Sequence, residues 1–447
     1  MNRTGSATGE LLGIDFGALS DRTLYRASDH LFKHKTALED HMFGTVETLF
    51  NLQPVVTLYD LTNTYFEGEA AGQPKAKHGH SKERRSDAPL LTLGAVLDSS
   101  GFLRRTGIFP GNVVAAHTLE TMLTALAVPR GGIVVMDRGI ATEDNRAWMR
   151  AQGYIYLVVA RSPTRVFDPN AAMTTVSTAS KGEVTVYRDR VDGQEADATP
   201  YSEVLLRCHS IAREKKETGL MTHFQDRFEE GLRALQEGLS KPRTRKTLTD
   251  VQRKIGQLQK ANAVVAQHYD ITVTPDPTNT RAVAITWTLD PSEGSMLHKP
   301  GVYSLRSNCL DWDAEAMWKT YAMLTDTDDP GESVFRSLKS ELGLRPIYHH
   351  KERRADGHLF ISVIAYQAIQ VLRTRMAQTG MTASWTTIRN ALRTLPRITT
   401  AFARPDGRPD GRRVHIRNTA LPNADQAAVY HAMQIAPPAR NLRKTVV

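Results

Sequence analysis

The 447-residue sequence predicts an α/β fold in which a mixed sheet is flanked by helices and interrupted by an α+β insertion domain. Two observations lead to this prediction. In the first third of the chain, short apolar runs rich in β-branched residues alternate with segments of helical periodicity. A long, charged, helical stretch over about 218–268 then separates the last of these runs from later helices, as an inserted domain would.

The elements follow in order from these patterns. Residues 1–52 are expected to be helical, because LYRASDHLFKHKTALEDHMFGTVETLF carries apolar residues at helical spacing. The next segments are expected to be strands: 55–61 (VVTLYDL), then 90–98 and 101–109 as a hairpin. Helices and strands then alternate: helix 117–128, strand 131–137, helix 141–152 with Thr142 as N-cap, and strand 154–160. This order of three strands, helix, strand, helix, strand matches the RNase H-like arrangement.

The second half of the chain shows three further segments. Residues 161–300 are expected to form the insertion, with exposed strands at 184–191 and 283–289 around a helical hairpin. Residues 301–380 are expected to return to the core with a strand at 302–308 and two helices, the first beginning near Glu332. The expected domains are an N-terminal helical segment 1–52, core parts 53–160 and 301–380, the insertion 161–300 and a basic C-terminal region 381–447.

The charge of the chain is concentrated at one end. Lys and Arg number 57 against 48 Asp and Glu, a net charge of +9. Residues 381–447 contain eleven Lys/Arg and three Asp, which gives +8, so the rest of the chain is nearly neutral. The stretch ARPDGRPDGRRVHIR (403–417) is typical of a flexible basic loop. We expect this tail to add sequence-independent affinity for a polyanion.

Composition also excludes several classes of protein. Two cysteines, Cys208 and Cys309, cannot build a disulfide scaffold or a four-thiolate zinc site. Residues 359–372, the most apolar stretch, are shorter than a membrane span and indicate a buried helix. The N-terminus lacks the apolar core of a signal peptide, so a cytoplasmic protein is expected.

Two carboxylates stand out against this background. Asp60 and Asp137 are expected at the ends of buried strands, where a carboxylate must be solvated, paired or bound to a metal ion. Ligand sites of open α/β sheets lie beyond the carboxyl ends of their strands. Two carboxylates meeting there could hold Mg²⁺, and a third from a nearby helix would complete a two-metal site for phosphoryl transfer.

Six blocks of the sequence, in order, resemble the signature blocks of bacterial insertion-sequence transposases of the DDE class, IS-four group, which have an RNase H-like core. The resemblance runs from about residue 10 to residue 380. The blocks are YDLTNTYFEG (59–68), GHSKERRSD (79–87), LTLGAVLDSSGF (91–102), GN (111–112), VVMDRGIATEDN (134–145) and FRSLKSELGLRPIYH (335–349).

The resemblance implies a function and a site. Asp60, Asp137 and Glu332 would be the catalytic triad and would hold two Mg²⁺ ions, with Mn²⁺ able to substitute. The family places a lysine after six intervening residues from the glutamate, which is Lys339. Further phosphate contacts are expected from Arg336, on the same helix, and from the basic run that contains Lys82 and Arg84. The partner implied is double-stranded DNA, both transposon ends and target, bound by a homodimer close to the bacterial nucleoid.

The sequence departs from the family pattern in two places. The spacing at which relatives carry a tyrosine and an arginine before the glutamate lands on Thr325 and Asp328. Only 59 residues precede Asp60, which suggests a shortened DNA-binding region. Glu332 also fits a capping box begun by Asp329, in which case Glu341 would be the alternative third carboxylate. Two other functions therefore stay open: a catalytically impaired remnant that only binds DNA, and an RNase H-like nuclease unrelated to transposition.

Overall fold

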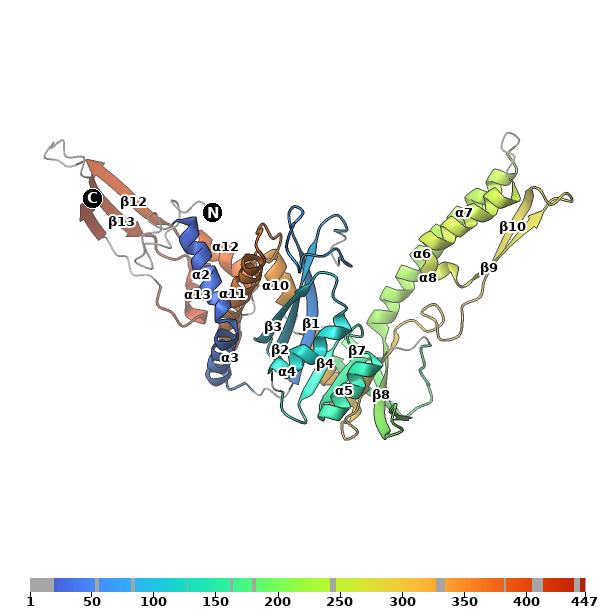
Figure 1. Ribbon diagram of the computed structural model, residues 1–447, viewed down its shortest axis with the longest axis horizontal. Coiled ribbons are helices and arrows are strands. Elements are labelled where there is room, and N and C mark those ends of the chain that lie inside the picture. The colour runs from blue at the N-terminus through green and yellow to red at the C-terminus, as the bar shows by residue number, and fades with distance from the viewer. Residues whose placement is uncertain are drawn as a thin grey trace. The chain divides into compact units, whose positions relative to one another are not determined.

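The computed structural model describes residues 20–52, 56–81, 85–126, 128–160, 164–178, 182–241, 247–326, 334–381, 383–403, 413–437 and 443–446. The chain forms two compact units. Unit 1 combines Met1–Val135 with Met323–Val447, and unit 2 is Met136–Ala322. The predicted α/β class, with a large mixed sheet flanked by helices, is confirmed (Figure 1). The finer division into five domains stays a prediction.

Unit 1 is built on four neighbouring strands in the order β3-β2-β1-β4. β2 pairs antiparallel with both β1 and β3, as the predicted hairpin requires. The strands are β1 (Val56–Tyr65), β2 (Leu90–Asp98), β3 (Leu103–Pro110) and β4 (Ile133–Met136). All nine residues of β2 are buried, which is typical of a central strand covered on both faces.

β1 is longer than the sequence predicts, and this corrects the position of Asp60. The strand continues through Thr62, Thr64 and Tyr65, β-branched and aromatic residues that favour extended backbone. Asp60 therefore lies in the middle of β1, opposite Ala95 of β2, and not at the end of a strand. Asp137, by contrast, directly follows β4, as predicted.

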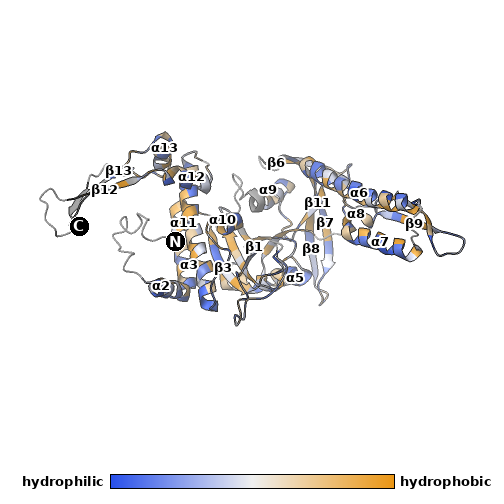
Figure 2. Ribbon diagram, turned by 90° about the horizontal axis from the view of Figure 1, so that it is seen from above, coloured by the Kyte–Doolittle hydropathy of each residue, from blue (hydrophilic) through white to orange (hydrophobic). Residues whose placement is uncertain are grey.

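Helices of unit 1 pack against β3 and against one another. α3 (Lys35–Phe50) and α4 (Leu119–Leu126) contact β3, and α2 (Asp21–Lys33) lies along α11 (Glu352–Gln378). Phe43, Val46 and Phe102 form an apolar cluster beneath α3. The prediction that residues 359–372 form a buried helix is confirmed in the centre of α11, where apolar residues recur along the helix (Figure 2).

Side chains from two helices cover the outer edge of β3. Gln367 of α11 accepts a hydrogen bond from the Leu103 amide at 3.0 Å and donates one to its carbonyl at 2.7 Å. Glu39 of α3 accepts from the Thr106 amide at 3.1 Å, and Lys35 donates to the Thr106 carbonyl. These contacts fix α3 and α11 on the sheet at defined positions.

The C-terminal region contradicts the prediction of a flexible tail. α12 (Trp385–Arg393) and α13 (Ala424–Ala432) pack on the end of α11 through Met376, Ile388 and Val429. β12 (Arg397–Ala403), β13 (Arg413–Thr419) and β14 (Arg443–Val446) form a separate three-stranded sheet. The predicted basic loop is thus wrong for 413–417, which lie in β13, while 404–412 are outside the described residues. A few apolar side chains at helical spacing are enough to form a small core, even in a region whose high net charge suggests a flexible tail.

Unit 2 contains a second set of neighbouring strands, in the order β5-β11-β8-β7-β6. β11 pairs antiparallel with β5 and β8, and β7 pairs antiparallel with β8 and β6. The bounds are β5 (Ile155–Val159), β6 (Thr174–Thr178), β7 (Gly182–Gln194), β8 (Pro200–Ser210) and β11 (Val302–Ser307). β6 and β8 are absent from the sequence prediction, although both lie in the segment expected to be an insertion.

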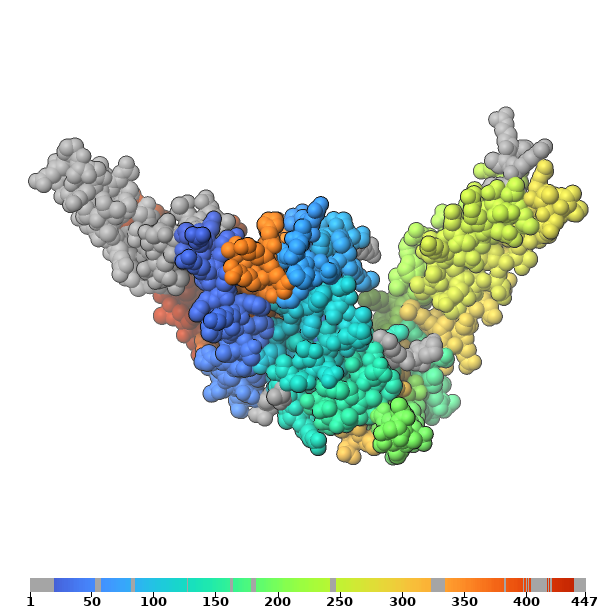
Figure 3. Space-filling model, viewed as in Figure 1, coloured from blue at the N-terminus to red at the C-terminus, as the bar shows by residue number. Residues whose placement is uncertain are grey.

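The predicted helical hairpin is confirmed in the rest of that segment. α6 (Ile211–Leu239) packs on α7 (Leu248–Ala261), α8 (Ala263–Ala266) and the antiparallel pair β9 (Tyr269–Pro275) and β10 (Ala282–Leu289). Figure 3 shows the segment from α6 to β10, coloured yellow-green to yellow, as one closely packed body. Their shared core includes Phe228, Leu232 and Val251, all fully buried. α9 (Ala314–Asp326) follows β11. None of the described helices combines the length and the hydropathy that crossing a membrane requires.

Candidate active site

Asp60 is held at a defined place by the strand that carries it. Its neighbours Tyr59 and Leu61 are buried, while Asp60 itself is half-buried. Its Oδ1 accepts a hydrogen bond from the Leu61 amide at 2.7 Å. Burial, with a contribution from the charge of Asp60, raises the pKa of the Tyr59 phenol, which bonds Thr118 at 2.5 Å. Asp60 is thus a half-buried carboxylate between two buried neighbours on a central strand.

Asp137 begins a tight turn between β4 and α5 (Glu143–Gln152). Its side chain is exposed, and its Oδ1 accepts from the Arg138 amide at 2.7 Å. Its carbonyl accepts from the amides of Ile140 and Ala141 at 3.0 and 3.3 Å. Thr142 then caps α5 by accepting from the Asn145 amide, as predicted. The turn therefore places the Asp137 carboxylate at the carboxyl end of a fully buried strand.

The strands that carry the two aspartates are neighbours. Asp60 lies on β1, Asp137 directly follows β4, and β4 lies next to β1 in the sheet. Carboxylates are the ligands that Mg²⁺ and Mn²⁺ prefer, so the chemistry of this pair fits a hard divalent cation. Among the described residues, no group of three or more His, Cys, Asp or Glu side chains gathers as a complete metal site.

α10 (Val334–Ser340), which carries Arg336 and Lys339, is anchored close to β1. Leu338 is fully buried, whereas Arg336 is exposed and Lys339 is half-buried. The segment after α10 bonds to the last part of β1: Thr64 donates to the Leu344 carbonyl at 2.8 Å, and the Ile347 amide donates to the Tyr65 carbonyl at 2.9 Å. The helix ends at Ser340, so Leu342 lies beyond the helical stripe predicted for it.

Three predicted site residues, Glu332, Lys82 and Arg84, lie outside the described residues. Arg85, from the same basic run as Lys82 and Arg84, stacks its guanidinium 4.4 Å from the ring centre of Tyr65 and pairs with Asp87. The run therefore continues into a residue that contacts the last residue of β1.

Glu341, the alternative third carboxylate, is bound elsewhere. It follows the end of α10 and accepts a hydrogen bond from Thr386 at the start of α12. This contact gives Glu341 a structural role between α10 and the C-terminal helices.

The histidines that the sequence places around α10 take part in packing. His358 bonds the Gly343 carbonyl at 2.8 Å, and its ring lies 5.4 Å from that of His349. Burial lowers the pKa of both histidines, so they are neutral at neutral pH. His78 and His80 are exposed.

Sequence reasoning missed Tyr321, which lies in the electrostatic field of Asp137. Burial raises the pKa of this phenol, the positive charge of Arg213 opposes that shift, and the negative charge of Asp137 adds to it. Tyr321 is four residues before Thr325, which is one turn of α9 earlier than the position tested.

Comparisons with known proteins assign the chain to a family. No curated protein sequence matches it. Among solved structures, it is similar to the piggyBac transposase in its synaptic complex with hairpin DNA, with 9% sequence identity, a TM-score of 0.25, and coverage of 92% of this chain and 75% of the other. A family model described as a transposase DDE domain matches residues 51–309, more than half of the chain, and spans both aspartates. The chain therefore belongs to the family of transposases with a DDE domain, enzymes that cleave DNA and transfer its strands.

Proposed function

We propose that this transposase catalyses metal-dependent cleavage and strand transfer of double-stranded DNA, in the cut-and-paste transposition of an insertion sequence. One observation carries the proposal. Asp60 and Asp137 lie within the region matched by the DDE domain, on β1 and directly after the neighbouring strand β4. The family match favours transposition over a nuclease of another kind and over a protein that only binds DNA.

Asp60, Asp137 and Glu332 are the residues we propose to bind two Mg²⁺ ions, with Mn²⁺ able to substitute. When bound, such ions activate a water molecule or a DNA 3′-hydroxyl and stabilise the leaving 3′-oxygen. The three carboxylates would hold these ions next to the scissile phosphate. β1 supplies a rigid position for Asp60, and the turn after β4 supplies one for Asp137. No side chain has to form a covalent bond to DNA.

Positive side chains near β1 are proposed to hold the DNA backbone. Arg336 and Lys339 project from α10, whose following segment is bonded to the end of β1. Lys82 and Arg84 belong to the run that reaches Tyr65 through Arg85. Phosphate contacts of this kind position a duplex without reading its sequence.

We further propose that two copies of the chain act together, because cut-and-paste transposition must cleave and join two DNA ends. The setting we propose is the bacterial cytoplasm, at the nucleoid. The two free cysteines, Cys208 and Cys309, are consistent with a reducing compartment. Light scattering of the protein with and without duplex DNA would test the dimer: a mass of one chain on two-ended DNA would contradict it.

The central test is excision from DNA that carries the gene with its native flanking sequences. We expect purified protein with Mg²⁺ or Mn²⁺ to release a fragment with defined ends, and EDTA to prevent release. Asp60→Asn and Asp137→Asn should each lower the cleavage rate by at least ~100-fold while leaving the affinity for the flanking DNA within about threefold.

Asp144→Asn is the matched control, because Asp144 is an exposed carboxylate on α5 outside the proposed triad. Its cleavage rate should equal that of the wild type. An Asp137→Asn protein that cleaves at the wild-type rate, or wild-type cleavage that persists in EDTA, would refute the proposed mechanism.

A further inference from the structure

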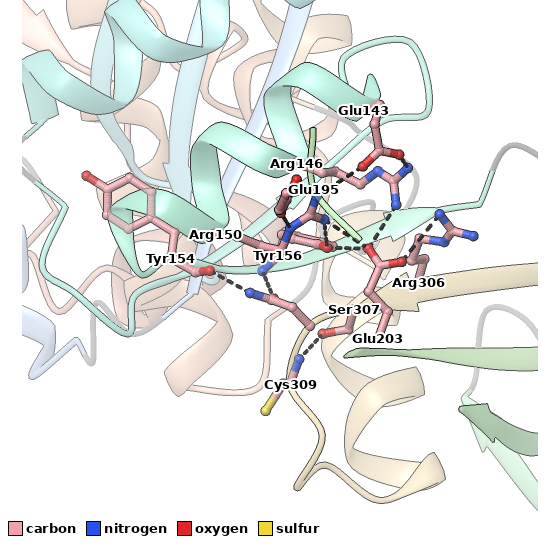
Figure 4. A network of polar contacts seen from close by, with 11 residues as sticks. Glu143, Arg146, Arg150, Tyr154, Tyr156, Glu195, Glu203, Arg306, Ser307 and Cys309 are labelled. Carbon is pink, nitrogen blue, oxygen red and sulfur yellow. Dashed lines mark hydrogen bonds and ion pairs between the residues drawn. The ribbon is translucent and has the colours of Figure 1, made fainter. Parts of the chain in front are cut away.

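Glu203 is a buried carboxylate at the centre of a polar cluster in unit 2 (Figure 4). The residue lies on β8 and is 1% exposed. Its Oε1 accepts hydrogen bonds from Arg146 at 2.8 Å, from Arg150 at 3.4 Å and from the phenol of Tyr156. Its Oε2 pairs with Arg306 of β11 at 3.4 Å. One carboxylate thus joins α5 to three strands of the sheet.

A group of this kind is costly to bury and is stabilised only by its partners. A carboxylate moved out of water loses several kcal/mol of hydration, which charged hydrogen-bond donors must offset. The positive partners of Glu203 have acidic contacts of their own: Arg146 and Arg150 both pair with Glu143, and Arg150 also pairs with Glu195. The guanidinium of Arg150 also stacks 3.9 Å from the ring centre of Tyr201. The cluster is therefore close to neutral and is held in one arrangement.

The cluster attaches α5 to the sheet through charged side chains. Of the ten residues of this helix, all of them described, only Arg146 and Met149 are buried. Met149 supplies the fully buried apolar contact of α5, and the two arginines, one helical turn apart, bind the helix to Glu203 of the sheet. The strands themselves are already joined by backbone hydrogen bonds from β5 through β11 to β8. Glu203 thus fixes the helix more than it fixes the sheet.

The start of α5 is tied in turn to Asp137. The Asn145 side chain donates to the Ile140 carbonyl at 2.7 Å, and the Ile140 amide donates to the Asp137 carbonyl at 3.0 Å. A displacement of α5 along the sheet would therefore move the turn over residues 137–142. Three hydrogen bonds therefore connect Glu203 to Asp137: Arg146 to Glu203, Asn145 to Ile140, and Ile140 to Asp137, with Arg146 and Asn145 adjacent in the chain.

We propose that Glu203 is a positioning residue for Asp137: through Arg146 and Arg150 it holds α5, and α5 holds the turn that presents the Asp137 carboxylate. This inference rests on the proposed function, in which Asp137 binds the divalent ion. It also gives the segment 161–300 a direct part in catalysis, because β8 belongs to that segment. Contacts that orient a metal-binding side chain commonly contribute 10- to 100-fold to metal affinity or activity.

Glu203→Gln is the principal test, because the amide keeps the shape of the side chain and removes its charge. We expect the Mn²⁺ concentration for half-maximal cleavage to rise about 10-fold, with DNA affinity unchanged within about threefold. A second measurement is independent of activity. Hydrogen–deuterium exchange of the peptide covering residues 137–142, in protein without metal, should become at least ~10-fold faster.

Glu217→Gln is the matched control in the same unit. Glu217 of α6 is also a buried carboxylate, and the partners to which it is bonded, Arg165, Arg213 and the Gly301 amide, lie outside α5. Its substitution should disturb local packing without changing the Mn²⁺ requirement or the exchange of 137–142. Arg146→Lys is the milder second variant, since it keeps the charge and loses the planar fork that binds Glu203.

The outcomes separate the two proposals. A raised Mn²⁺ requirement and faster exchange in both Glu203→Gln and Arg146→Lys, with neither change in Glu217→Gln, support the positioning role. Unchanged values in the Glu203 and Arg146 variants, or equal changes in Glu217→Gln, overturn it while leaving the proposed function intact. If Asp137→Asn cleaves normally, the proposed function itself is wrong, whatever the Glu203 variants do.

Discussion

Asp98, at the end of β2, offers a quantitative test of how the hairpin that supports β1 is stabilised. The residue is 1% exposed, and its Oδ1 accepts hydrogen bonds from the amides of Phe102 at 2.7 Å and Ser100 at 3.1 Å. Burial raises the pKa of the Asp98 carboxyl to about 6, although these hydrogen bonds and the charge of Arg104 oppose the shift. The folded protein therefore binds this proton more tightly than the unfolded chain does.

The sign and size of the effect follow from linkage. Between the unfolded pKa of 3.8 and the folded pKa of about 6, the folded state keeps a proton that the unfolded chain has lost. The free energy of unfolding consequently falls as the pH rises through this window. A difference of about two pKa units corresponds to roughly 3 kcal/mol, lost by pH 7.

Asp98→Asn removes the titration and keeps an oxygen that can accept both amide hydrogen bonds. We expect the variant to gain about 3 kcal/mol relative to the wild type between pH 4 and pH 7. Denaturant unfolding at a series of pH values measures this difference for the transition of unit 1. Glu69→Gln, which replaces an exposed carboxylate of unit 1, is the control. Parallel wild-type and Asp98→Asn curves over that range would refute the assignment of the pH dependence to Asp98.

Three further predictions concern the supports of the proposed site. Glu39→Ala should lower the free energy of unfolding by about 3 kcal/mol, measured by denaturant unfolding, because it leaves buried positive charge without its partner. Leu338→Ala should cost about 3 kcal/mol in the same assay, since this fully buried residue holds α10 on unit 1; a cost below ~1 kcal/mol would contradict that packing. Arg336→Gln and Lys339→Gln should each reduce by about one the slope of log affinity for duplex DNA against log salt concentration, and an unchanged slope would exclude a phosphate contact.

Local patterns allow the strands β2 and β3 and the start of α5 to be predicted from the sequence. β2 is a long apolar run that a short polar turn joins to β3, and Thr142 carries the signature of an N-cap, so each could be recognised without its neighbours. The sequence pattern predicts Asp60 at the end of a strand because the apolar run VVTLYDL stops directly after it. The strand continues because Thr62 and Thr64 remain buried against other elements, which a local pattern does not reveal.

Features that depend on distant partners could not be predicted in this way. Glu203 sits in a strand that was not recognised, and its burial depends on arginines of α5 and β11 far away in the sequence. The basic composition of the C-terminal region predicts a flexible tail and gives no sign of a core. Ile388 and Val429 nevertheless form one, because they pack with Met376 of α11. In both cases, contacts between residues far apart in the sequence determine the structure, and a local pattern does not contain them.

The covering of β3 has a consequence for how copies of this chain can meet. β3 is the outermost strand of the order β3-β2-β1-β4 in the described part of the chain, and such an edge is a template onto which a strand of another molecule can add. At Leu103 and Thr106 the outward backbone groups are already occupied by Gln367, Glu39 and Lys35. These side chains form the hydrogen bonds that a neighbouring strand would otherwise form with β3 at these two residues. They therefore protect the molecule against edge-to-edge aggregation and leave any specific pairing of copies to other surfaces.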